Sequence, residues 1–210
     1  MKRTKAWIYF FVPLGVLAVS LLYLWLAGEA DAAAVKERVV RFHVVAASDS
    51  EADQQLKCEV RNGVFELVER LFADCVDQRE ALAVAEAHRM ELQKEAEQIL
   101  REKGCNDAVT VEIGDRYFPT KDYGTLSFPA GRYQAVSLRI GAAEGENFWC
   151  VLFPALCLSP AVESEAAEQE MTAVIGADKT EFLKKSDQTQ RVKFFLVEWI
   201  AQFAEFFLNF

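Results

Sequence analysis

The stretch VVRFHVVA at residues 39–46, followed by SDS at residues 48–50, decides the fold of this chain. Apolar side chains occupy every second position from Val40 to Ala46, and Arg41 and His43 face the other way. This alternation predicts a half-buried strand. Ser50 precedes Asp53 at the spacing of a capping box, so we expect a helix to begin immediately after the strand.

Two helices are expected to follow this strand. Apolar residues recur at spacings of three and four from Leu56 to Leu71, which predicts an amphipathic helix that ends near Ala73. Asp77 is placed to cap a second helix, and Gly104 suits the left-handed position that ends one.

After Gly104 the apolar period changes from helical to two. Alternation at 109–113 and at 133–140 predicts two strands, and FWCVLF at 148–153 predicts a third. The near-continuous apolar run at 148–153 favours a central place in the sheet. We therefore expect an α+β fold in the order β-α-α-β-β-β, with two helices on one face of a four-stranded, mainly antiparallel sheet.

The N-terminus carries an export signal. Lys2, Arg3 and Lys5 precede Ala6–Ala27, a segment without a charged residue. As a helix this segment would be about 33 Å long, enough to cross a membrane, and the basic start orients it with its N-terminus inside. Small residues at 30–34 offer cleavage sites. Residues 1–34 are therefore a signal peptide or a membrane anchor, and both alternatives place the remainder outside the cytoplasm.

The exported part divides by composition. Residues 35–160 form the expected globular domain, and residues 161–188 turn acidic and small, which predicts a loosely ordered linker. Residues 189–210 have the pattern of an amphipathic C-terminal helix with a wide apolar arc. That helix could dock on the domain's own core, or lie in a membrane interface or a partner's groove.

The overall charge is acidic, with 23 basic and 32 acidic residues and a net charge of −9. Such a surface repels phosphate, so nucleic-acid binding is disfavoured. A basic or neutral protein surface is the natural complement.

Five cysteines leave pairing open. Cys58 and Cys75 lie in one predicted helix at a separation of roughly 25 Å, too far for a disulfide. Cys150 and Cys157 are the candidate pair, since the intervening segment contains a proline that turns the chain. The alternative is that all five are reduced, buried thiols.

Catalytic and metal-binding motifs are weak in this sequence. The two histidines, His43 and His88, fit no HExxH motif, and the cysteines form no CxxC pair, so we expect no metal and no cofactor. A thiol-dependent or cell-wall hydrolase using Cys150 and His43 is the enzymatic alternative, although an apolar run around Cys150 favours an inert thiol. We therefore expect a binding protein and not an enzyme, without a small-molecule substrate.

A loop at residues 117–131 is rich in aromatic residues, proline and glycine. Aromatic side chains on a shaped loop suit a binding hot spot, particularly beside a lysine. The predicted partner-binding residues are Phe118, Lys121, Tyr123, Tyr133 and Trp149. In the alternative interpretation, Phe118 and Trp149 fill the core while the glycines and proline hold turns.

Four segments in order resemble the stage II sporulation protein R family of endospore-forming bacteria. Together they cover roughly residues 39–158, with Phe148 standing where the family usually has a second tryptophan. The segments are RFHVVAASDS at 41–50, YFPTK at 117–121 with Tyr123-Gly124, PAG at 129–131 with Tyr133 and Ala135, and NFWCVLFP at 147–154 with Leu156-Cys157.

This resemblance implies a signalling protein made in the forespore and exported into the space between the forespore and mother-cell membranes. There, proteins of the family are needed for a membrane-embedded aspartic protease to process the precursor of sigma-E. The resemblance thus implies a protein partner in a membrane, and it implies that the chain is not itself the protease.

Overall fold

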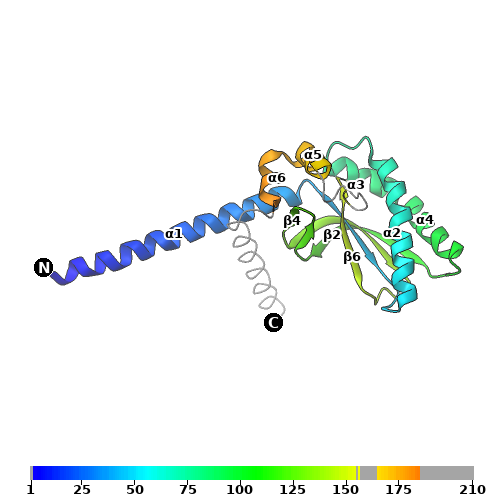
Figure 1. Cartoon of the computed structure of the whole chain (residues 1–210), viewed down its shortest axis with the longest axis horizontal. Helices are drawn as coiled ribbons and strands as arrows, with labels where there is room; N and C mark the ends of the chain where they lie inside the picture. Colours follow the sequence, from blue (N-terminus) through cyan, green and yellow to red (C-terminus); the bar gives the residue numbers. More distant parts are fainter. Residues whose placement is uncertain (1, 155, 157–164, 185–210) are drawn as a thin grey trace.

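The computed structural model describes residues 2–154, 156 and 165–184, and Figure 1 shows the arrangement. A long N-terminal helix leads into a domain of mixed helices and strands. The elements are α1 (Lys2–Lys36), β1 (Val40–Val45), α2 (Glu51–Phe72), α3 (Gln78–Ala87), α4 (Arg89–Glu102), β2 (Val109–Phe118), β3 (Lys121–Tyr123), β4 (Leu126–Phe128), β5 (Gly131–Ile140), β6 (Asn147–Phe153), α5 (Glu165–Ile175) and α6 (Ala177–Leu183).

The main sheet has the order β2-β5-β1-β6. Strand β1 runs parallel to β5, and the β1–β6 and β2–β5 pairs are antiparallel. The expected α+β class and mainly antiparallel sheet are confirmed. The expected central place for 148–153 is wrong, because β6 lies at an edge. The second half of β6 is apolar because both of its faces are covered, with Leu152 in one core and Val151 in another.

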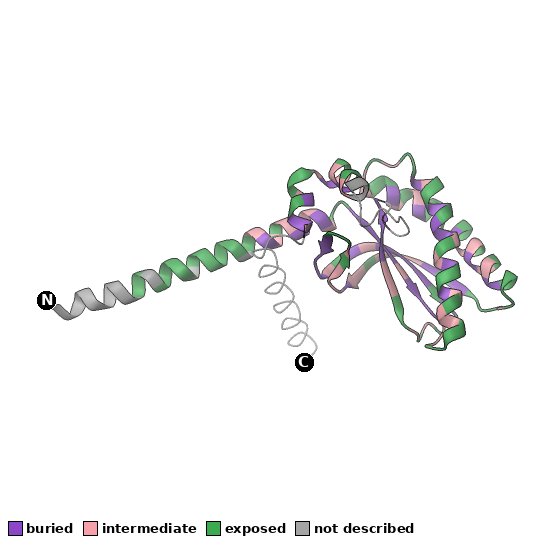
Figure 2. Ribbon diagram, in the orientation of Figure 1, coloured by how far each residue is buried: buried purple, intermediate pink, exposed green. Residues whose placement is uncertain are grey.

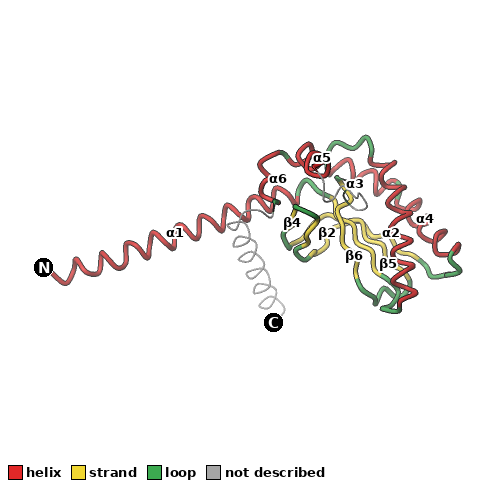
Figure 3. The backbone as a smooth tube through the Cα atoms, viewed as in Figure 1, coloured by secondary structure: helices red, strands yellow, loops and turns green. Residues whose placement is uncertain are grey.

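Helices α2, α3 and α4 cover one face of this sheet (Figure 3). The Ser50 side chain accepts from the Asp53 amide to begin α2, and Asp77 accepts from the Glu80 amide to begin α3. The single second helix expected from Asp77 to Gly104 is two helices, interrupted at His88. This bend lets the apolar residues of both helices reach one core, which includes Phe42, Val64, Phe65, Ala85, Leu92, Ala96, Leu138 and Leu152.

A second layer covers part of the opposite sheet face. It consists of the end of α1, the β3–β4 hairpin, α5 and α6, and its core includes Ala32, Val35, Phe118, Leu126, Phe128, Tyr133, Met171, Ile175, Phe182 and Leu183. Residues 165–184, expected to belong to an acidic linker, thus contribute two helices. Met171, Ile175, Phe182 and Leu183 of these helices are buried in the second core, and Glu181 is exposed. The expected amphipathic helix at 189–210 lies outside the described residues.

Helix α1 has two parts with different surroundings. Among the described residues, one helical segment, Leu14–Lys36, is long and apolar enough to cross a membrane. Figure 2 shows exposed residues along the projecting part of α1 and buried residues where the helix meets the domain. An N-terminal helix of this kind is compatible with a signal peptide or a membrane anchor.

Candidate functional site

The loop singled out in the sequence folds as the β3–β4 hairpin, which lies over the end of the sheet face opposite α2–α4. Lys121 pairs with Phe128 and Tyr123 pairs with Leu126. Leu126 and Phe128 are buried beneath the hairpin, and the Asp122 carboxylate accepts from the Ser127 hydroxyl at 2.7 Å. The hairpin is therefore anchored by its apolar side chains and by the buried Ser127, and Asp122 is exposed.

Under the hairpin lies Arg41, which is fully buried. Its Nε donates to the Cys150 carbonyl at 2.9 Å, and one terminal nitrogen donates to the Tyr123 hydroxyl at 3.1 Å. Four aromatic rings surround the guanidinium at 4.5 to 5.8 Å, an arrangement that supplies cation–π attraction. The rings belong to Phe118, Tyr123, Phe128 and Tyr133.

Hydroxyl groups complete this buried cluster. Tyr123 donates to the Trp149 carbonyl at 3.0 Å, and Tyr133 donates to the Pro129 carbonyl at 2.6 Å. Burial raises the pKa of both hydroxyls, and the charge of Arg41 opposes this shift in each. Both tyrosines thus stay neutral, and Arg41 has no carboxylate counter-ion among the ion pairs of the described residues.

Beyond the hairpin, the same sheet face continues without a described helix packed on it. We call this part the open half-face. Strand register places side chains from all four strands there, and Trp149 is opposite His43, which is opposite Ser137, which is opposite Glu112. The open half-face consists of Glu112, Arg116, Ser137, Arg139, His43, Asn147 and Trp149.

His43 and Trp149 stack at the centre of the open half-face. Their ring centroids are 4.0 Å apart and the two rings are nearly parallel. The Trp149 ring also packs edge-on against Phe118, with 4.7 Å between the ring centroids. His43 Nε2 and Asn147 Oδ1 are 2.7 Å apart. An aromatic column thus runs from the half-buried stack down to the ring that lies against Arg41.

Positive charge gathers around this stack. Burial lowers the pKa of His43, the hydrogen bond that the ring donates to the Asn147 side-chain oxygen opposes that shift, and the nearby charges of Arg116 and Arg139 lower the pKa further. Arg116 is paired with Glu112, whereas Arg139 is exposed and forms no ion pair with a described residue. The open half-face is therefore locally cationic on a chain whose net charge is −9.

The five residues predicted to bind a partner separate into two groups. Phe118 and Tyr133 are buried, so the expectation that they form an exposed contact surface is wrong for this conformation. Their rings fill the second core around Arg41, as the alternative interpretation expected for Phe118. Lys121, Tyr123 and Trp149 are half-buried and remain candidates for contact.

The proposed catalytic pair of Cys150 and His43 is wrong, because the two side chains lie on opposite faces of the sheet. Cys150 is opposite Phe42 in the register and belongs to the helix-covered core, whereas His43 stacks on Trp149 on the other face. Cys150 is also disulfide-bonded and so is not a nucleophile. Its predicted pairing with Cys157 remains a prediction, since Cys157 lies outside the described residues.

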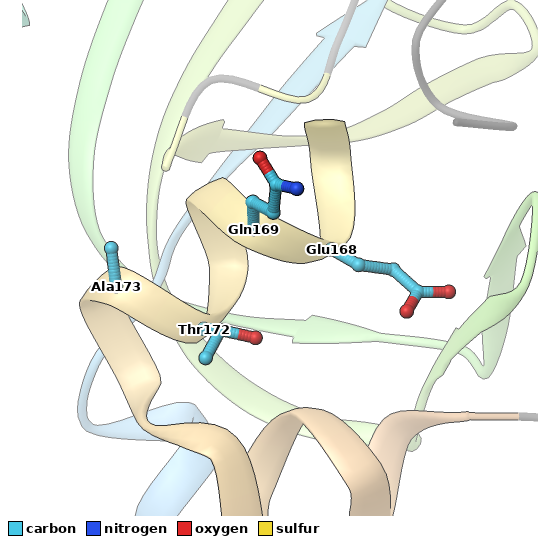
Figure 4. Close-up of a pocket in the computed structure, with 4 residues that line it drawn as sticks. All are labelled: Glu168, Gln169, Thr172 and Ala173. Atoms are coloured by element: carbon cyan, nitrogen blue, oxygen red, sulfur yellow. The ribbon is translucent and has the colours of Figure 1, made fainter. Parts of the chain in front are cut away.

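Other chemistry is sparse in the part of the chain that the structure describes. No three His, Cys, Asp or Glu residues there are grouped to hold a metal ion. A pocket beside α5, shown in Figure 4, is lined by Glu168, Gln169, Thr172 and Ala173. Glu168 already accepts from the Thr125 hydroxyl at 2.8 Å and pairs with Lys184 at 2.9 Å, so this carboxylate joins the hairpin to α6.

Sequence reasoning missed Arg41, Arg116, Ser137 and Arg139 as members of the site. Arg41 was placed on the polar face of its strand, where an arginine ordinarily reaches solvent. The missing information was that the aromatic loop folds back over that face. The signal that could have found Arg41 is the alternating strand at residues 39–46 taken together with the aromatic-rich loop at residues 117–131. Aromatic rings on a loop need a surface to pack against, and the polar face of this strand offers one.

Comparison with known proteins adds to this geometry. The family described as stage II sporulation protein R matches residues 36–163. The stage II sporulation protein R of Bacillus subtilis (strain 168) is 33% identical over 184 residues, covering 80% of this chain and 82% of that protein. No solved structure matches the chain. The family match at residues 36–163 includes the helix-covered core, the hairpin and the open half-face, whereas the α1, α5 and α6 residues of the second core lie outside it.

Proposed function

This chain belongs to the stage II sporulation protein R family, and from that premise we propose that it carries a signal from forespore to mother cell across the space between their membranes. It is a sporulation signalling protein. Its target in this proposal is the membrane-embedded aspartic protease that processes the precursor of sigma-E. The family match over residues 36–163 is the observation that carries the proposal.

Helix α1 supports export as the first step. It is compatible with a signal peptide or an anchor, and the three basic residues before its apolar part orient it with the N-terminus in the cytoplasm. The domain that follows would then act outside the forespore membrane.

Binding, not catalysis, is the proposed mode of action. The cysteine and histidine that could have formed a nucleophile pair lie on opposite sheet faces. The domain instead offers a half-buried aromatic stack beside free positive charge, which suits recognition of another protein. Activation would follow when binding favours the active conformation of the protease.

The test reconstructs the signal in a bacterium that does not sporulate. The full-length chain is produced together with the membrane protease and the sigma-E precursor, and the processed form is measured by immunoblot. We expect processing only when all three are present. Absence of processing with all three present and correctly located would contradict the proposal.

A matched control tests whether the chain must be exported, and not only be present in the cell, for processing to occur. Replacing Leu17, Val19, Leu21 and Leu22 with Glu makes α1 too charged to enter a membrane and leaves the domain unchanged. This variant should accumulate inside the cell without triggering processing. Normal processing by the retained variant would place the signal in the cytoplasm and overturn the proposed route.

A further inference from the structure

Two buried polar atoms lack a hydrogen-bond partner among the described residues, and both lie on the same face of the sheet. They are one terminal nitrogen of Arg41 and the hydroxyl of Ser137. Register places Arg41 opposite Ala135 and places His43 opposite Ser137, so the two residues are diagonal neighbours on adjacent strands. Because unpartnered buried polar atoms are rare, their shared location marks this face as unusual.

Ser137 lies within the open half-face itself. It is 1% exposed and stands between His43 on one strand and Glu112 on another. Its hydroxyl is covered by the surrounding side chains and does not contact solvent. The groups that a partner can reach on the open half-face are therefore the exposed and half-buried side chains around Ser137.

The charge of the open half-face selects the kind of acceptor. Arg139 supplies a positive charge that forms no ion pair with a described residue, and the charge of Arg116 is shared with Glu112. A basic partner would be repelled here, although it would suit the acidic chain as a whole. The expectation of a basic or neutral complement, drawn from net charge, therefore fails to describe this face.

Trp149 supplies the apolar part of the surface. Tryptophan and arginine are the residue types that most often dominate the energy of protein interfaces. The Trp149 ring is fixed between His43 and Phe118, so little rotational freedom is lost when a partner covers it.

We propose that the open half-face binds an acidic segment of the membrane-bound partner, with Trp149 as the apolar anchor and Arg139 as the donor to a carboxylate. This inference rests on the proposed function, because it names the surface and the chemistry by which the signal is recognised. Aspartate or glutamate oxygens match the guanidinium, because its N–H groups donate to a carboxylate in a paired geometry.

The experiment reverses one charge in the full-length chain. Arg139→Glu is compared with Arg70→Glu, which makes the same change at an exposed position of α2, on the opposite side of the sheet, where the arginine forms no ion pair with a described residue. Both variants are measured in the three-component processing assay, and their thermal unfolding is recorded. We expect Arg139→Glu to reduce processing about tenfold or more, while Arg70→Glu stays near wild type, because an acidic partner segment meets the new carboxylate only at the first site.

A charge swap tests the acidic partner directly. Each acidic residue in the extracytoplasmic part of the protease is changed to Lys in turn and combined with Arg139→Glu. One such change should restore processing with Arg139→Glu. Failure of every swap, or normal processing by Arg139→Glu alone, would overturn the inference.

These outcomes are separable from the proposed function. If the wild-type chain gives no processing, the signalling role itself fails. If the wild type is active and Arg139→Glu is equally active, the signalling role stands and only the assigned surface is wrong. An unfolded Arg139→Glu protein would be replaced by Arg139→Gln, which removes the charge without reversal and should reduce processing by a smaller factor.

Discussion

The Tyr123 hydroxyl joins Arg41 to Trp149, accepting from the guanidinium at 3.1 Å and donating to the Trp149 carbonyl at 3.0 Å. One phenolic oxygen thus connects the hairpin to β1 and β6. Replacing Tyr123 with Phe keeps the ring and removes both hydrogen bonds. We expect the free energy of unfolding to fall by about 1–3 kcal/mol, since the Arg41 donor is left buried.

Urea unfolding of the full-length chain in detergent measures this loss. Tyr23→Phe is the matched control, because Tyr23 is 70% exposed on α1 and the same oxygen is removed there. Equal stability of the two variants would mean that the Tyr123 hydroxyl contributes nothing to holding the hairpin.

A second prediction concerns the docking of α1 on the domain. Val35 is fully buried in the second core, and Asp31 pairs with Lys179 of α6 at 2.7 Å. Val35→Ala should lower the free energy of unfolding by about 1–3 kcal/mol through lost burial. Lys179→Ala should lower it by no more than about 1 kcal/mol, since the pair is partly exposed.

Hydrogen exchange along residues 28–36 reads out this docking locally, with protection expected to fall more in Val35→Ala. Leu26→Ala is the control, because Leu26 is 53% exposed on the same helix. Unchanged protection in all three variants would show that the end of α1 is held by other contacts.

A third prediction follows from Gly145 in the turn before β6. A Cβ at this position would overlap the backbone carbonyl of Ser48, and the Gly145 amide already donates to Ala46 at 3.1 Å. Gly145→Ala therefore has to move one backbone segment away from the other. We expect a loss of about 2–4 kcal/mol, within the range of strained backbone substitutions, measured by thermal unfolding against the exposed control Glu144→Ala.

The fourth prediction is the pH dependence contributed by His43. Burial lowers its pKa in the folded state below the unfolded value of 6.5. Between these two values the unfolded chain binds more protons, so stability falls as the pH decreases below about 6.5 and is unaffected by His43 above it. The slope attributable to one histidine is at most about 1.4 kcal/mol per pH unit.

His43→Phe keeps a ring against Trp149 and removes the titration. The unfolding free energy of the wild type should fall relative to that of this variant as the pH is lowered from 7.5 to 5. A constant difference across that range would show that the folded-state pKa of His43 is not lowered.

Local patterns in the sequence were enough to predict the strands and the helix starts. Ser50 and Asp77 cap helices because their side-chain oxygens satisfy free amides close by in the chain. The alternation from Val40 to Val44 likewise fixes which face of β1 meets the helices. These features depend on neighbours within a few residues and are therefore visible in one sequence.

Long-range features were not predictable in the same way. Parallel pairing of β1 with β5 joins residues such as Arg41 and Ala135, which are far apart in the chain. The burial of Phe118 and Tyr133 depends on the hairpin folding over Arg41 and on α5 and α6 closing the second core. No periodicity within the loop distinguishes rings that point inward from rings that face a partner.

The continuity of α1 has a mechanical consequence. The helix runs unbroken from Lys2 to Lys36, and its last turns are held by Ala32 and Val35 in the second core. In a lipid bilayer such a helix would be a rigid connection and not a flexible tether. Tilting or rotating the helix would therefore turn the whole domain with it. In the anchored form the domain would sample few orientations and would stay close to the membrane. Cleavage of the helix would remove this orientation and let the domain diffuse further.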